Sequence, residues 1–152
     1  MSSLPPDTSP KTPDEHAVAV ALALLAQGRD AEGWAAYEAR RKLLPDLNIP
    51  SRLGIAEWQG ESLAGKHILV FPEQGFGDQL LASRFIVRLK AMAAGVVVLC
   101  PAPLVRLFGA TGVEVFAWPG ELNLPPVDVW TPIMSLPFRF GATLETIPPP
   151  PY

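Results

Sequence analysis

A short apolar run, followed at once by a glycine loop and a helical pattern, constrains the fold of this chain more than any other feature. Residues 67–71 (HILVF) have the composition of a β-strand, and the loop after them, PEQGFGD, contains two glycines. From residue 79 to 93 apolar side chains recur every four positions, which predicts a helix. A strand, a tight loop and a helix in this order are typical of a parallel α/β sheet.

The pattern of strands and helices continues towards the C-terminus. Residues 96–100 (VVVLC) read as a strand that is buried on both faces, 101–108 as a short helix, and 113–117 and 127–132 as two further strands. Strands separated by helices imply right-handed crossovers. The sequence therefore predicts an α/β fold with part of a doubly wound, Rossmann-like parallel sheet, strand order 3-2-1-4, and helices on both faces.

The residues ahead of this sheet divide into three parts. Residues 1–13 are rich in Pro, Ser and Thr and are expected to be a disordered tail. Residues 14–45 are expected to form a helical hairpin, with Asp14 as the first cap and Pro45 as the end of the second helix, which starts at residue 30. Residues 46–66 are expected to be a linker, and residues 67–152 the α/β domain.

Composition excludes several classes of protein. At 152 residues with 49% hydrophobic side chains, the chain has room for one domain with a buried core. The net charge of −3 argues against a nucleic-acid partner. The longest apolar run, residues 17–26, is shorter than a membrane span and follows acidic residues rather than a basic region. A single cysteine, Cys100, fits a reducing compartment, so a cytoplasmic protein is expected.

Several short motifs of the sequence together resemble those of one bacterial family. The spacing of Gly28, Gly33, Tyr37 and Pro45 resembles the second half of a tetratricopeptide repeat (TPR). The phrases that extend the likeness are Gly33-Trp34, Tyr37-Glu38-Ala39-Arg40, Trp58-Gln59-Gly60, Glu73-Gln74-Gly75-Phe76-Gly77-Asp78, Arg84-Phe85, Ser135-Leu136-Pro137 and Pro151-Tyr152. They resemble TPR proteins whose C-terminal region is related to the ADP-heptose lipopolysaccharide heptosyltransferases, glycosyltransferases of the GT-B fold.

The resemblance implies a function for the glycine loop. GT-B enzymes pair an acceptor-binding Rossmann-like domain with a donor-binding one, and residues 67–152 correspond to part of the first. In the heptosyltransferases an aspartate just after the first-strand loop acts as general base, and Asp78 matches it. The donor half is absent, so we expect a truncated or split glycosyltransferase-like protein, inactive alone, that meets a nucleotide sugar and acceptor only when a donor domain completes it.

Each candidate site residue has a structural alternative. Asp78 is the candidate catalytic residue, or simply a helix N-cap. Substrate contacts are assigned to Glu73, Gln74, Gly75, Gly77 and Arg84. Glu73 and Gln74 can instead shape the loop through backbone hydrogen bonds, the glycines can serve backbone geometry alone, and Arg84 can be an ordinary solvated arginine.

Two other functions remain open from the sequence. One is a non-catalytic, TPR-type protein-interaction module, and the other is a small-molecule or nucleotide-binding fragment that uses the glycine loop. No metal site or cofactor is expected, because His16 and His67 lie far apart without ligand neighbours. The last strand is expected to have an unpaired edge, or one that is covered only by the proline-rich C-terminal residues, which predicts marginal stability or self-association.

Overall fold

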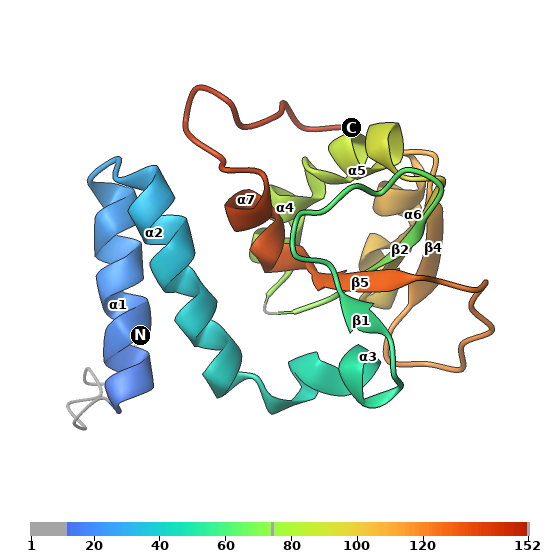
Figure 1. The fold of residues 1–152 in the computed structure, drawn as a ribbon, viewed down its shortest axis with the longest axis horizontal. Coiled ribbons are helices and arrows are strands. Elements are labelled where there is room, and N and C mark those ends of the chain that lie inside the picture. The colour runs from blue at the N-terminus through green and yellow to red at the C-terminus, as the bar shows by residue number, and fades with distance from the viewer. Residues whose placement is uncertain (1–11, 74, 152) are drawn as a thin grey trace, which may run out of the picture.

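The computed structural model of the chain describes residues 12–73 and 75–151. Its centre is one parallel sheet with strands in the order β1-β5-β2-β3-β4 (Figure 1). The strands are β1 (Ala56–Glu57), β2 (His67–Phe71), β3 (Gly95–Cys100), β4 (Glu114–Ala117) and β5 (Val129–Pro132). All four pairings in the sheet are parallel.

The order of the four longer strands, β4-β3-β2-β5, is the predicted order 3-2-1-4. The prediction of an unpaired edge was wrong, because β1 pairs with β5 through Ala56 opposite Val129 and Glu57 opposite Trp130. A strand of two residues carries no alternation that sequence reasoning can detect. The segment 46–66, expected to be a linker, therefore supplies the edge strand of the sheet.

One face of the sheet is covered by helices that follow the strands. They are α4 (Phe76–Ser83), α5 (Ile86–Met92), η3 (Ala102–Leu104), α6 (Val105–Gly109), η4 (Ile133–Ser135) and α7 (Leu136–Arg139). Alternate residues of β2 divide between the faces: Ile68 and Val70 point to these helices, and Leu69 and Phe71 to the other side.

The second face carries less helix than predicted. It is covered by two short elements, η2 (Pro45–Asn48) and α3 (Ile49–Arg52), together with the loop 118–128, through residues such as Leu47, Ile49 and Leu122. Helices on both faces were expected, and on this face they amount to single turns. Trp130 anchors this layer, since its indole N–H donates to the Ser51 hydroxyl at 3.1 Å.

The predicted helix over 79–93 is two helices, and it begins earlier than expected, at Phe76. The break falls at Arg84-Phe85. Immediately before it, the Ser83 hydroxyl donates to the Leu80 carbonyl at 2.7 Å. A serine that hydrogen-bonds back to its own helix competes with the backbone ladder and bends the helix.

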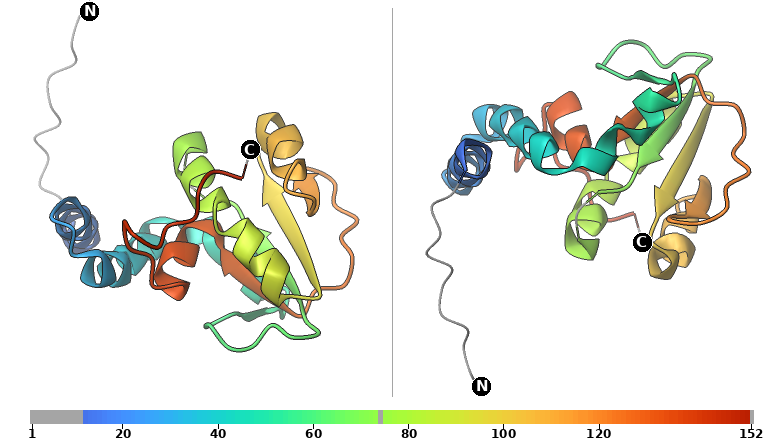
Figure 2. Two further views of the ribbon diagram at one scale, coloured as in Figure 1. Left: turned by 90° about the horizontal axis from the view of Figure 1, so that it is seen from above. Right: turned by 90° about the horizontal axis from the view of Figure 1, so that it is seen from below.

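The N-terminal hairpin consists of α1 (Pro13–Ala26) and α2 (Asp30–Tyr37), which continues as the 3-10 helix η1 (Glu38–Leu43). The cap of α1 is Thr12, not Asp14 as predicted, because Thr12 and Glu15 form a reciprocal capping box. Residues 1–11 of the expected tail lie outside the described residues. In both views of Figure 2, α1 lies on the outside of the molecule and α2 lies between it and the sheet.

Among the residues described, every helix is too short or too polar for a bilayer crossing.

Candidate functional site

The candidate site lies at the point where the strand order reverses, between β2 and β5. The chain runs from β2 outward through β3 and β4, and then returns to β5 on the other side of β2. In open α/β sheets, ligands bind at the carboxyl ends of the strands at such a switch point. Here the two loops that leave β2 and β5 lie side by side, because the Met134 N–H donates to the Glu73 carboxylate at 2.9 Å.

The two glycines of the β2–α4 loop are not there for an unusual backbone conformation. Gly75 is the N-cap of α4 with φ −78° and ψ 171°, and Gly77 also lies outside the positive-φ region. A methyl group on Gly77 would meet open space, and one on Gly75 would meet only an Asp78 oxygen at 3.8 Å. Both glycines are exposed. Neither glycine therefore needs a positive φ, and the lack of a side chain at both exposed positions leaves the loop accessible to a ligand.

Asp78 is the third residue of α4 and is partly buried. It is not the N-cap, because Gly75 holds that position. Its carboxylate lies over the first turn, within 3.8 Å of the place where a Gly75 side chain would begin. A carboxylate here is favoured by the positive end of the helix dipole. The geometry thus presents an acidic oxygen beside exposed loop backbone at the carboxyl edge of the sheet.

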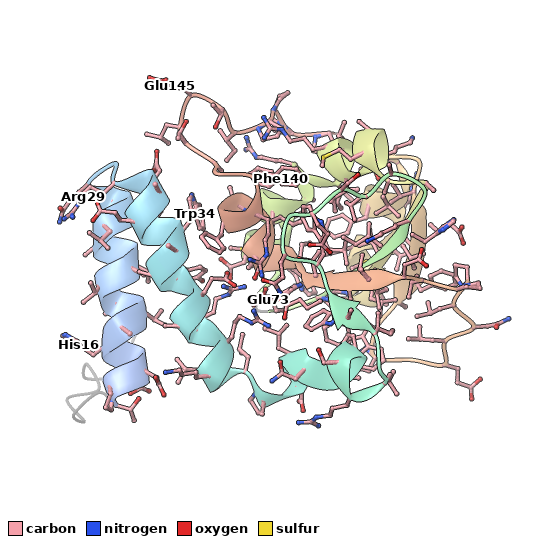
Figure 3. The ribbon with its side chains drawn as sticks, viewed as in Figure 1. His16, Arg29, Trp34, Glu73, Phe140 and Glu145 are labelled. Carbon is pink, nitrogen blue, oxygen red and sulfur yellow. The ribbon has the colours of Figure 1, made fainter. Side chains whose placement is uncertain are left out.

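Glu73, expected to contact substrate, is engaged inside the protein. Its side chain is 2% exposed and forms a bidentate pair with Arg40, at 2.7 Å to Nη2 and 2.9 Å to Nε. Figure 3 shows Glu73 between the helical hairpin and the end of β5. Both oxygens therefore face partners within the chain, and Gln74, the next candidate, lies outside the described residues.

Arg40 is buried at the switch point, between the loops that leave β2 and β5. A guanidinium has five N–H donors. Beyond the two bonds to Glu73, Arg40 donates to the Ser135 hydroxyl at 3.2 Å, to Glu38 at 2.9 Å and to the Tyr37 carbonyl at 3.2 Å. Burial opposes the charge of Arg40, but the hydrogen bonds and charges of Glu73 and Glu38 outweigh it and raise the pKa of the guanidinium. The hairpin is thus fixed to both exit loops by one buried side chain.

A second charged cluster fixes the hairpin to the edge of the sheet. Arg41, next to Arg40, donates to both oxygens of Glu57 in β1 at 2.9 and 2.7 Å. Arg139 at the end of α7 reaches the same carboxylate at 3.1 Å. Burial acts to lower the pKa of Arg41, but the hydrogen bonds and charge of Glu57 outweigh burial, so the pKa of the guanidinium is raised. The hairpin is therefore held by ion pairs at two places.

Arg84, the remaining candidate for substrate contact, lies in the break between α4 and α5 and donates to the Pro148 carbonyl at 3.2 Å. One turn later Arg88 donates to the Thr146 carbonyl at 3.2 Å and lies over the Phe140 ring. The two arginines hold the C-terminal segment against the helices. Arg84 is thus placed for a structural contact with the C-terminal segment.

The other reactive residues are accounted for by their structural surroundings. Cys100 is buried, and burial raises the pKa of its thiol to about 11, so it is a protonated, hydrophobic side chain. His67 and Asp128 meet at the opposite end of the sheet, where Asp128 accepts the His67 backbone N–H at 2.7 Å. Within residues 12–73 and 75–151, no three His, Cys, Asp or Glu side chains are grouped as a metal site would need.

Sequence reasoning missed the most deeply buried part of the site. Arg40 and Ser135 both stand in phrases that the family resemblance singled out, but no role was assigned to them. Their partners lie 33 and 95 positions away in the chain. The one sequence feature that connects Arg40 and Ser135 with Glu73 is that all three stand in the motifs that carry the family resemblance.

Comparison with known proteins gives one partial relative. The chain is 39% identical to protein FlbA of Caulobacter vibrioides over an alignment 83 residues long, and the match covers 51% of this chain and 14% of FlbA. The chain thus spans a small part of the length of that relative. No family model matches the chain, and no solved structure matches it.

Proposed function

We propose that this chain is the acceptor-side half of a glycosyltransferase of the GT-B type. The parent reaction is transfer of a sugar from a nucleotide sugar to a hydroxyl group. The observation that carries the proposal is the position of Asp78: a carboxylate in the first turn of the helix that follows the central strand, beside two exposed glycines. An acceptor hydroxyl that attacks an anomeric carbon must lose its proton, and a carboxylate at this edge can receive it.

The described residues form one α/β domain, and a GT-B enzyme needs two such domains. The role proposed for this chain is therefore to bind the acceptor and to supply the general base. The nucleotide sugar would be held by a second domain, on this or another polypeptide. The single buried cysteine favours the cytoplasm, where nucleotide sugars are made available, as the compartment.

Chemical-shift perturbation of the ¹⁵N-labelled chain tests this proposal. Methyl glycosides of glucose, galactose and mannose serve as acceptor probes, and UDP-glucose and ADP-glucose as donor probes. We expect at least one glycoside to shift the backbone amides of residues 75–78, and D78A to weaken that binding. If no glycoside shifts them, or only the nucleotide sugars do, the acceptor-side assignment is wrong.

One observation favours a second function, that of a protein-interaction module. α1 contains ten consecutive apolar residues, from Ala17 to Ala26, yet Ala21 is its one buried residue. Val20 and Leu22 are 44% and 52% exposed. A helix that is apolar all round is normally covered on all sides. If this function is correct, V20E/L22E abolishes self-association or partner binding measured by light scattering without unfolding the chain.

A further inference from the structure

A hollow of about 170 Å³ lies beside the candidate site, on the face of the sheet opposite α4. Its walls come from the end of β2, from the residue after β4, and from the segment that joins the hairpin to the sheet. The residues that matter for its chemistry are Leu44, Asp46, Leu47, Phe71, Glu73 and Trp118. The hollow is therefore at the carboxyl edge of the sheet, where ligands of α/β folds bind.

The floor of the hollow is aromatic. Phe71 is 4% exposed, and its ring packs between Trp118, at 5.4 Å between centroids, and Trp130, at 6.2 Å. Trp118 is itself held at the strand end, because its backbone N–H donates to the Cys100 carbonyl at 2.8 Å. Since Trp118 is only partly buried, it is the ring that the hollow offers to a ligand.

The two carboxylates that line the hollow differ in whether they can bind a ligand. Glu73 is committed to Arg40 and the Met134 N–H. Asp46 is exposed at the rim on η2. The hollow therefore combines one aromatic face, aliphatic walls and one solvent-facing carboxylate.

We propose that this hollow binds one pyranose ring of the acceptor, with its C–H face against Trp118 and a hydroxyl donated to Asp46. This inference rests on the proposed function and names the chemical class of its acceptor. A volume of 170 Å³ is below the ~300–1,000 Å³ of drug-sized ligand sites, so it suits a single ring rather than a nucleotide. An apolar wall with few polar groups is the usual lining of such a site.

An organic cation is the competing ligand, because aromatic rings and a carboxylate also bind ammonium groups. Cages for quaternary ammonium groups surround the cation with several ring faces. Here Phe71 is covered by the two tryptophans, which leaves Trp118 as the ring presented to a ligand. The arrangement favours stacking on one face over enclosure.

The test follows the indole N–H signal of Trp118, assigned by its loss in W118F, while methyl β-D-glucopyranoside or tetramethylammonium chloride is added to the ¹⁵N-labelled chain. We expect the glycoside to shift this signal and the salt to leave it in place. W118A and D46N should each weaken glycoside binding at least tenfold. D46N changes an exposed side chain and leaves the fold intact, so it remains informative if W118A does not fold. W34F, which alters a tryptophan of the hairpin, is the matched control and should bind normally.

The outcomes separate this inference from the proposed function. If the glycoside shifts the amides of residues 75–78 but not the Trp118 indole, the ring-binding hollow is wrong and the acceptor-side function stands. If the glycoside shifts neither, the proposed function fails as well. If the salt shifts the indole and the glycoside does not, the hollow is a cation site and the inference is overturned.

Discussion

Removal of Arg40 tests whether a buried ion pair holds the helical hairpin to the sheet. In R40M the Glu73 carboxylate stays buried, at 2% exposure, and loses both bonds to the guanidinium. Breaking one side of a buried ion pair costs about 3–5 kcal/mol. Since a domain of this size has about 5–15 kcal/mol of stability, R40M should lose a large part of it.

Removal of the partner, Glu73, is expected to cost a similar amount. In E73M the Arg40 guanidinium keeps its 2.9 Å bond to Glu38, but the Met134 N–H loses its acceptor, so the change should also cost about 3–5 kcal/mol. In the double variant R40M/E73M no charge of this pair remains, and the main loss is the acceptor of the Met134 N–H, about 1–3 kcal/mol. The double variant should therefore be more stable than R40M alone.

Urea unfolding followed by tryptophan fluorescence measures all three variants. The control is R29M, which removes an exposed ion pair with Glu32 on the same hairpin and should leave the unfolding midpoint unchanged. If R40M unfolds at the same urea concentration as R29M, or if the two single changes simply add in the double variant, the buried pair does not hold the hairpin as argued.

Three further predictions concern two glycines, Gly77 and Gly60, and the thiol of Cys100. G77A should stabilise the chain by up to ~1 kcal/mol, because Gly77 lies in α4 with open space at its Cβ; a destabilised variant would contradict this. G60A should destabilise it in the same urea assay, because Gly60 has φ +106°, and an unchanged midpoint would refute the strain argument. Cys100, with a pKa raised to about 11, should stay protonated and unlabelled by a disulfide reagent at pH 8 until urea unfolds the chain; prompt labelling of the native protein would show that the thiol is accessible.

The order of the sheet could be predicted because its signals are local. The runs at 67–71 and 96–100 are continuous and β-branched or apolar, and each is followed by a helical pattern. Those features fix the type of connection between strands, and the handedness rule then limits the order. β1 carries no such signal, since its two residues enter the sheet only through pairing with β5.

The candidate site was predictable at its loop and not at its centre. The positions of Gly75, Gly77 and Asp78 follow from a strand and a helix that are adjacent in the chain. The environment of Glu73 cannot be predicted in this way, because its partner Arg40 reaches the loop only once the hairpin has packed on the sheet. Long-range ion pairs of this kind depend on tertiary packing, and no local pattern reports them.

The most direct test of the account is a crystal structure of the chain grown with a methyl hexopyranoside. If Asp78 is the general base, a sugar hydroxyl lies within hydrogen-bond distance, ~2.5–3.0 Å, of its carboxylate. A structure in which no sugar contacts residues 75–78, even where one occupies the Trp118 hollow, or in which a nucleotide binds this loop in preference to the sugar, would contradict this assignment.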